Sequence, residues 1–385
     1  MPISPGPSPS AEHAPHDPLA SVRGRVLLHV KSVSRAPLGR IPADSGGVVF
    51  SGKDARKNAQ DFVSATGSGP PVVLDPSAYE SAYATEEEPF TLESQHCLDT
   101  WRTGLGATLE ILGSGPADLA LTPTRYLRCD SEGARALEEA VRQMNTVDLA
   151  NVVFAAPVDA GWLNDRREHL ISCLQRVNRV PTALILGAKG NPLESESRAR
   201  GLREVLKACP GTGLLRTDLA ALDAMVHGAA FASIGDTASV RHAVPPGRQG
   251  GPPNSDSSPN LILPELMGYF RGSTLAEHLR NSLYCLCDPC TEWGEARANG
   301  EAGRLPSGFQ DSSDTPDAHA HNMAIWSRWW RELSSESSVN AMKTRWRGMC
   351  ERAYNEYGWH NRVISPRKDV FKVPPSLRYW GGGRG

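Results

Sequence analysis

Short apolar runs rich in β-branched residues recur along the first two thirds of the chain, each followed by a helix-like stretch. Runs of this length without polar alternation are typical of strands that are buried on both faces of a parallel sheet. Strand and helix in alternation predict right-handed crossovers and therefore an α/β fold. The candidate strands are 26–30, 47–50, 72–74, 119–121, 152–155, 183–186, 213–215 and 230–234.

The number of these runs favours one α/β architecture. Eight candidate strands match a (β/α)8 barrel of the TIM type, and a doubly wound open sheet is the alternative. Helices are expected between the runs, at 54–64, 95–111, 132–144, 165–177, 197–209 and 219–227.

Three cysteines lie within six residues at Cys285, Cys287 and Cys290. Thiols at this spacing can surround one tetrahedral metal ion, and the Asp-Pro pair between the second and third favours a turn. A fourth ligand is needed, and His319 and His321 are the nearest candidates downstream. A closed Cys3His shell leaves no open position for water, so the pattern predicts a structural Zn²⁺ site. Three incidental thiols in a loop are the alternative.

Composition and charge exclude several classes of protein. The formal net charge is −2, which gives no overall electrostatic signature for nucleic acid or a membrane surface. No apolar run approaches the roughly 18–20 residues that a membrane span requires. The N-terminal segment lacks the basic start and apolar core of a signal peptide, so we expect a disordered tail over 1–20 and a cytoplasmic protein. In a reducing compartment, clustered cysteines usually bind metal.

The three-cysteine spacing, followed by His321-Asn322 at the opening of an apolar helix, resembles the zinc subdomain of the tRNA-guanine transglycosylases. In that family a (β/α)8 barrel carries such a site near its C-terminal end, and the ligand histidine belongs to the His-Asn pair. The resemblance implies His321 as the fourth ligand. We therefore expect a barrel over 21–270, a zinc subdomain with a closing helix over 271–350, and a basic, Trp-containing tail over 351–385.

The resemblance also implies a reaction, which is base exchange in tRNA or DNA by a pentosyl-transferring glycosyltransferase. A carboxylate attacks the ribose anomeric carbon, guanine leaves, and a 7-deazaguanine takes its place. The family's nucleophile is an aspartate at the end of a late strand, where this chain has Ala232, and Asp236 follows four residues later. Asp44-Ser45-Gly46-Gly47 is similar to a base-binding segment of the family, with Val48 in place of its aromatic residue.

Functional side chains of a barrel lie directly after its strands, which gives a set of candidates that is independent of the family. Candidates for acid–base or nucleophilic work are Asp75, Asp159 and Asp236. Candidates for substrate binding are Arg216, Asp218, Arg241 and His242.

These candidates also have a purely structural interpretation. A carboxylate at a strand end often caps the next helix, which applies to Asp75, Asp236 and especially Asp218. Arg216 lies in a buried strand and needs a partner, for which we expect Asp218. His29 in the first strand is expected to be a core or interface residue.

The stretch from Trp326 to the end holds six of the nine tryptophans and 12 Lys/Arg against 5 Asp/Glu. Aromatic and basic side chains together can stack on bases and meet phosphates. The alternative, which we favour, is a stripe formed by Trp326, Trp329 and Trp330 that packs a helix onto the barrel.

Three hypotheses about function follow. The first is a transglycosylase-like enzyme whose partners are tRNA or DNA and a purine or 7-deazapurine base. The second is a non-catalytic, nucleic-acid-binding or accessory member of the same superfamily, which Ala232 motivates. The third is an unrelated metabolic barrel enzyme with a zinc staple. A homodimer is compatible with each hypothesis, and no membrane partner is expected.

Overall fold

The computed structural model describes residues 17–382 apart from 68, 93–94, 98–99, 103, 249–255, 280–283, 296–302 and 365–368. Most of the tail expected over 1–20 therefore lies outside the described residues, and Leu19 at its end is buried. No helix of the described part combines the length and the apolar character needed to cross a membrane.

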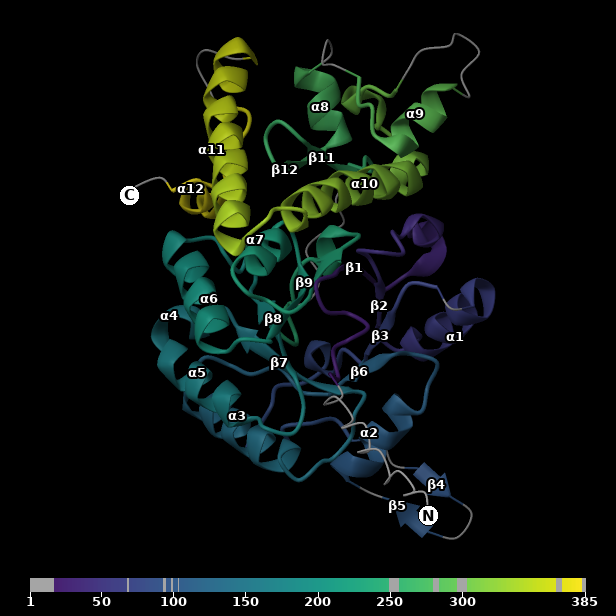
Figure 1. Cartoon of the computed structure of the whole chain (residues 1–385), viewed down its shortest axis with the longest axis vertical. Coiled ribbons are helices and arrows are strands. Elements are labelled where there is room, and N and C mark those ends of the chain that lie inside the picture. Colours follow the sequence, from purple (N-terminus) through teal and green to yellow (C-terminus); the bar gives the residue numbers. More distant parts are fainter. Residues whose placement is uncertain are drawn as a thin grey trace, which may run out of the picture.

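Eight strands close into a parallel barrel in the order β1-β10-β9-β8-β7-β6-β3-β2, which confirms the predicted (β/α)8 architecture and excludes an open sheet (Figure 1). Each predicted run contributes one strand. Their bounds are β1 Val26–Val30, β2 Val48–Ser51, β3 Val72–Asp75, β6 Leu119–Leu121, β7 Val152–Asp159, β8 Thr182–Gly187, β9 Gly213–Thr217 and β10 Ala232–Gly235.

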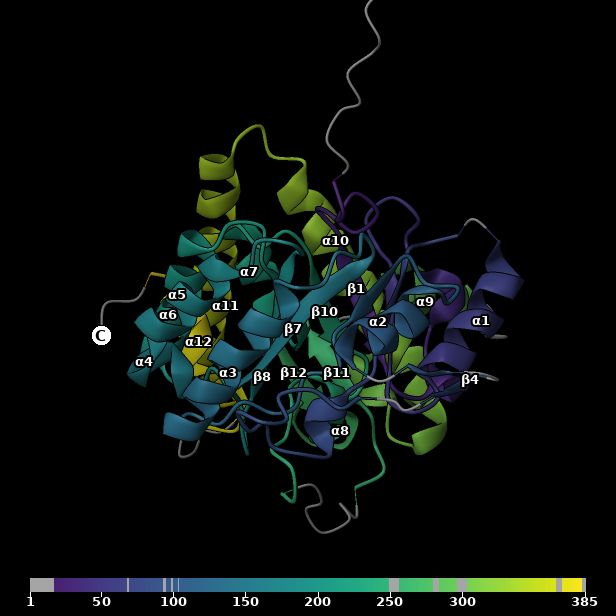
Figure 2. The same ribbon diagram turned by 90° about the horizontal axis from the view of Figure 1, so that it is seen from below.

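Helices surround the strands, with α3, α5 and α6 on one side and α1 on the other in the view from below (Figure 2). Six of the helices follow the strands in the sequence as expected. The helices of the barrel are α1 Ala55–Thr66, α2 Leu105–Gly113, α3 Ser131–Met144, α4 Trp162–Asp165, α5 Arg167–Arg176, α6 Glu196–Ala208 and α7 Ala220–Val226.

The expected helix over 95–111 is wrong in its first half. Strands β4 (Gln95–Cys97) and β5 (Thr100–Arg102) pair there in an antiparallel hairpin, and α2 starts only at Leu105. Thr100 and Trp101 are residue types that favour strands, and this preference outweighs the helical pattern of the neighbouring apolar residues.

The two faces of the strands pack into two separate apolar clusters. Leu27, Val49 and Val73 belong to the cluster inside the barrel. Leu28 and Phe50, one residue further along their strands, belong to the cluster that contains the surrounding helices. This period of two is expected of strands that are buried on both faces. Alternate residues of each strand therefore point toward the barrel axis, and the residues between them point toward the surrounding helices.

The remaining elements form a layer on one side of the barrel (Figure 1). β11 and β12 pair in an antiparallel hairpin, and a chain of helices follows. The bounds are β11 Asn260–Leu263, β12 Gly268–Arg271, α8 Gly272–His278, α9 Asp288–Glu295, α10 Thr315–Ser334, α11 Val339–Ile364 and α12 Pro375–Trp380. The domain boundary expected at residue 350 falls inside α11, which continues through it without a break.

Helix α10 lies along the outside of the barrel. The Trp330 indole donates a hydrogen bond to the carbonyl oxygen of Gly24, just before β1. Near the other end of the helix, His319 lies close to Asp236, just after β10. Trp326, Trp329 and Trp330 are all buried, as the predicted packing stripe requires, and Trp330 makes the contact with the barrel.

Asp223 of α7 attaches the C-terminal helices to the barrel. Its carboxylate, 1% exposed, accepts two hydrogen bonds from Arg203 of α6 and one of 2.7 Å from the Trp346 indole of α11. Tyr379 of α12 covers the Arg203 guanidinium at 4.6 Å from its ring centroid. A buried carboxylate requires such partners, so α6, α7, α11 and α12 depend on one another.

We predict that Gly201→Ala destabilises the protein by about 2 kcal/mol or more, because a β-carbon there would lie 2.2 Å from the backbone oxygen of Leu163. Gly106→Ala is the matched control: it is also helical, a β-carbon meets nothing within 4 Å, and the change should stabilise by up to about 1 kcal/mol. Urea unfolding of both variants measures the difference, and equal effects would contradict the close packing of α6 on α4.

Candidate metal centre and the mouth of the barrel

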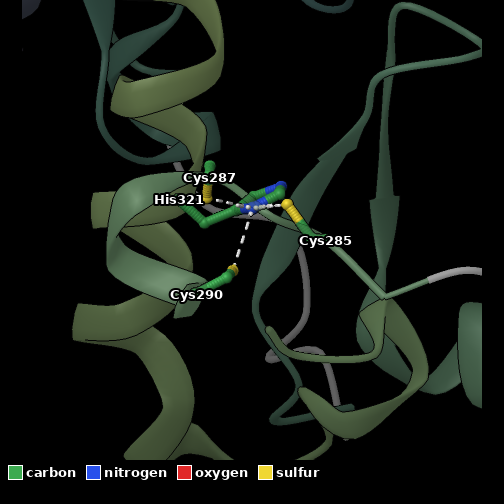
Figure 3. Close-up of side chains that lie close together, drawn as sticks. All are labelled: Cys285, Cys287, Cys290 and His321. Atoms are coloured by element: carbon green, nitrogen blue, oxygen red, sulfur yellow. Dashed lines mark hydrogen bonds between the residues drawn. The ribbon is translucent and has the colours of Figure 1, made fainter. Parts of the chain in front are cut away.

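Cys285, Cys287, Cys290 and His321 converge on one point (Figure 3). Their ligand atoms all lie within 4.8 Å of one another, and His321 Nδ1 is 3.4, 3.5 and 3.5 Å from the three sulfur atoms. A tetrahedral ion with ordinary metal–sulfur and metal–nitrogen bonds separates such atoms by about 3.6 Å. The cluster can therefore hold a metal ion in a closed Cys3His shell.

Local structure positions these ligands. Cys285 forms a two-way backbone bridge with Arg304, which fixes the segment before the second ligand. α9 begins directly after Cys287, so its first turn presents Cys290 toward the other sulfur atoms. His321 comes from the first half of α10. The cluster thus joins a loop, the short helix α9 and the long helix α10.

The other nitrogen of His321 fixes its tautomer. His321 Nε2 lies 2.9 Å from the carbonyl oxygen of Ile262 in β11, so this nitrogen carries the proton and Nδ1 is left for a metal. Asn322 accepts a hydrogen bond from the Ile262 backbone N–H and donates one to the Asn260 carbonyl oxygen. The His-Asn pair therefore holds both the metal cluster and the hairpin.

The contacts inside the cluster perturb its titratable groups. Side-chain contacts with Cys287 and Cys290 lower the pKa of the Cys285 thiol, which favours the thiolate that binds metals. Burial alone would lower the pKa of His321, but Cys285 and Cys287 raise it, so a metal ion that binds Nδ1 would displace a proton there. His319, the alternative ligand, lies outside the cluster, with Nδ1 3.9 Å from Asp236 Oδ2.

A second polar cluster fills the mouth of the barrel around Asp75. Asp75 is 1% exposed; one carboxylate oxygen accepts from the Ser77 backbone N–H, and the other accepts a 2.6 Å hydrogen bond from the Tyr79 hydroxyl. Burial alone would raise the pKa of Asp75, but His29 and Tyr79 hold it below its usual value. Asp75 is therefore an ionised carboxylate whose oxygens are already occupied by partners from the protein.

Arg216 supplies the opposite charge. Its guanidinium, on a side chain 3% exposed, donates to the Tyr79 hydroxyl and pairs with Glu80 at 2.6 Å. Lys31 pairs with the same Glu80, also at 2.6 Å. The expected pairing of Arg216 with Asp218 is wrong, because Arg216 has a φ of 54° at an irregular point of β9 and its side chain turns toward Glu80.

His29 joins this cluster from β1. Its Nδ1 lies 3.1 Å from the Ser233 hydroxyl oxygen, and its Nε2 lies 3.4 Å from Asp75 Oδ2, an electrostatic contact without hydrogen-bond alignment. Burial lowers the pKa of His29, and the neighbouring Asp75 opposes this shift. The contacts from Ser233 to His29 and from His29 to Asp75 resemble the Ser-His-Asp triad of hydrolases. The three residues are at most 1% exposed, however, which keeps a substrate away from Ser233.

Tyr126 closes the mouth on the opposite side. A β-carbon on Gly187 at the end of β8 would lie 2.4 Å from the Tyr126 ring, so the glycine makes room for this aromatic side chain. The Tyr126 hydroxyl donates a 3.1 Å hydrogen bond to Asp159, whose other carboxylate oxygen accepts from the Gly161 backbone N–H. Asp159 is half-buried and is the most accessible of the three predicted catalytic carboxylates.

Ala232 and Asp236 lie on the outer side of the barrel wall, away from this cluster. Ala232 belongs to the outer apolar cluster, between strand and helices, whereas Ser233 points toward His29. Asp236 accepts from the Thr237 backbone N–H and faces His319 of α10. Burial raises the pKa of Asp236 to about 6. Neither position directs a side chain toward the polar cluster around Asp75.

The remaining candidates have structural contacts at the end of β9 and β10. Asp218 accepts from the Ala220 backbone N–H at the start of α7, although the N-cap residue of that helix is Leu219. Arg241 stacks on the Tyr269 ring at 3.4 Å and so connects the barrel with the β11–β12 hairpin. The His242 carbonyl oxygen accepts from Arg216, and burial lowers the pKa of its imidazole.

Sequence reasoning missed Tyr79, Glu80, Ser233 and Tyr126. The inward orientation of Ser233 could have been predicted, because successive strand residues point to opposite faces and the neighbouring Ala232 faces outward. Tyr79 and Glu80 follow Asp75 closely in the sequence. Their role depends on contacts with Arg216, which lies more than a hundred residues further along the chain.

We predict that Cys287→Ser abolishes binding of one metal equivalent per chain and lowers thermal stability, because metal binding contributes directly to folding free energy. Elemental analysis of the purified protein and thermal unfolding measure both effects. Cys129→Ser, which alters a half-buried cysteine outside the cluster, should keep the metal. Full metal content in Cys287→Ser would contradict the assignment.

We predict that Asp236→Asn stabilises the protein at pH 7.5 but not at pH 4. The folded-state pKa of about 6 exceeds the ordinary value of 3.8, so the folded state retains a proton that the unfolded state has lost as pH rises between these values. Ionised Asp236 therefore costs up to about 3 kcal/mol above pH 6. Urea unfolding at both pH values measures this, with exposed Asp61→Asn as the control. A gain that is independent of pH would contradict the raised pKa.

Comparison with other proteins adds no assignment: no protein-family model matches the chain, and no curated protein matches it. The function must therefore be argued from the closed barrel, the Cys3His cluster and the filled mouth.

Proposed function

We propose that this chain is a tRNA-guanine transglycosylase-like protein that contacts tRNA or DNA and has lost base exchange. The observation that carries the proposal is the combination of a closed (β/α)8 barrel with a Cys3His cluster built from a C-x-C-x-x-C segment and a His-Asn pair. The same combination underlies the resemblance drawn from the sequence.

The donor set supports Zn²⁺ as the metal. Three thiolates and one imidazole around a single point suit a tetrahedral ion without redox chemistry. All four ligand positions are filled by the protein, and His321 is oriented by a backbone carbonyl. Bound there, the ion would stabilise the junction of α9, α10 and β11 and would not supply a reactive water.

A basic cleft supports contact with a nucleic acid. The cleft, about 490 Å³, lies between α10 and α11 and is lined by Arg328, Arg345 and Arg352 together with Glu332. Arg345 pairs with Glu332 and Glu336, which holds its guanidinium in place at the surface. Arginines at such a junction of helices can meet successive phosphates of a polynucleotide backbone.

The mouth of the barrel supports loss of the reaction. The strand position aligned with the family's nucleophile is Ala232, which faces the helices. Asp75, the carboxylate at the end of β3, is enclosed by Ser77, Tyr79 and His29. A base-exchange enzyme needs a carboxylate that can reach the ribose anomeric carbon, whereas Asp236 faces His319 and the oxygens of Asp159 are bonded to Tyr126 and Gly161.

Base exchange through Asp236 is the second candidate. Burial raises the pKa of this carboxylate to about 6, and perturbed carboxylates at the end of a barrel strand are typical of catalytic sites. For this reaction the end of β10 would have to turn Asp236 away from His319 and toward the barrel axis.

Base exchange and binding are measured together on the zinc-loaded chain with labelled guanine, bulk tRNA and double-stranded DNA. We expect salt-dependent binding of one polymer without incorporation of guanine. The double variant Arg345→Glu/Arg352→Glu should weaken binding at least tenfold and reduce the salt dependence, because phosphate contacts are lost. Arg142→Glu, an exposed arginine on α3, is the control.

The outcomes separate the candidates. Incorporation that disappears in Asp236→Ala would establish base exchange and end the proposal of a non-catalytic protein. Binding to neither polymer would remove the nucleic-acid proposal as a whole and favour the unrelated zinc-stapled barrel.

A further inference from the structure

A groove of about 910 Å³ lies between α11 and the metal-binding segment. Both of its walls stand on the same side of α10 (Figure 1). One wall is the last part of α11, and the other contains the end of α8 and the residues around the first two metal ligands. The residues of α11 that line it are Glu356, Trp359, His360, Val363 and Ile364.

These five residues have the spacing of a helix-packing stripe. They follow one another at i, i+3, i+4, i+7 and i+8, the pattern by which a helix buries one face against a neighbour. Trp359 is nevertheless 52% exposed and Val363 is 64% exposed. Large apolar side chains on such a stripe usually pack against another element, and here the described residues leave them open to the groove.

The opposite wall is apolar and firmly held. Tyr284 and Leu286 line it, 39% and 68% exposed, and they flank the metal ligand Cys285. Cys285 is fixed by its backbone bridge with Arg304 and by its contact with His321. A binding surface is more effective when it is held in place before its partner arrives, and this wall meets that requirement.

The charges around the groove are unbalanced. Glu265, Glu277 and Glu356 line it, against the single guanidinium of Arg328. The two lining histidines, His278 and His360, are neutral in the formal count at pH 7. An apolar strip with surplus carboxylates complements a ligand that is apolar on one face and basic at its edges.

We infer that this groove binds an amphipathic helix of another protein, with apolar residues at helical spacing and Lys or Arg at its flanks. A helix is the occupant that matches the groove. The side chains of the stripe on α11 form ridges, and the side chains of a second helix fit between them. The apolar face would cover Trp359, Val363 and Leu286, while its basic residues would meet the three glutamates. This inference is independent of the proposed nucleic-acid function.

The test is selection from a display library of 20-residue helical peptides on the zinc-loaded full chain. We expect the enriched peptides to combine apolar residues at i, i+3, i+4 and i+7 with a positive net charge. Trp359→Ala and Val363→Asp should each weaken their binding at least tenfold. Val339→Asp, which alters a 60% exposed apolar residue at the other end of α11, should leave binding unchanged.

Three outcomes would overturn the inference. They are a selection that enriches no helical peptide, an enrichment of acidic peptides, and binding that survives Trp359→Ala and Val363→Asp. Sedimentation of the free chain provides a fourth: a dimer that Val363→Asp dissociates would assign the groove to a second copy of the chain instead.

Discussion

The C-terminal third of the chain depends on the contacts that His321 makes through both of its ring nitrogens. One ring nitrogen faces three sulfur atoms, and the other is bound to a carbonyl of β11. A loop, a short helix, a hairpin and a long helix therefore meet at one imidazole. Because α10 also contacts the barrel through Trp330, the metal cluster and the barrel form one continuous arrangement. A metal ion bound by this cluster would stabilise the hairpin and α10 as well as the cysteine segment.

In the mouth of the barrel, contacts among charged side chains offset the free energy that is lost when these side chains are removed from water. Two carboxylates, Asp75 and Glu80, are matched by Arg216 and Lys31, and His29 lies beside Asp75. Desolvating ions is expensive unless each has partners at hydrogen-bond distance, and these groups provide them for one another. A ligand that entered this space would have to replace contacts that the protein already makes.

Much of the fold could be predicted because its signals are local. Continuous apolar runs identified the barrel strands, and the six-residue cysteine segment identified three of the four residues that could hold a metal ion. The hairpin at 95–102 was mistaken for a helix, since short stretches with mixed preferences are decided by their surroundings. The cluster around Arg216 depends on contacts across the barrel and on a left-handed backbone conformation, neither of which a residue pattern reveals.

The attachment of the C-terminal helices to Asp223 has a consequence for synthesis on the ribosome. The barrel strands and α7 leave the ribosome before α11 and α12 exist, so Asp223 at first has Arg203 and His227 as partners and lacks the Trp346 indole. The nascent barrel must wait for some 120 further residues before this carboxylate is fully enclosed. Chaperones would meet the chain in this interval, with its barrel assembled and one flank still open to solvent.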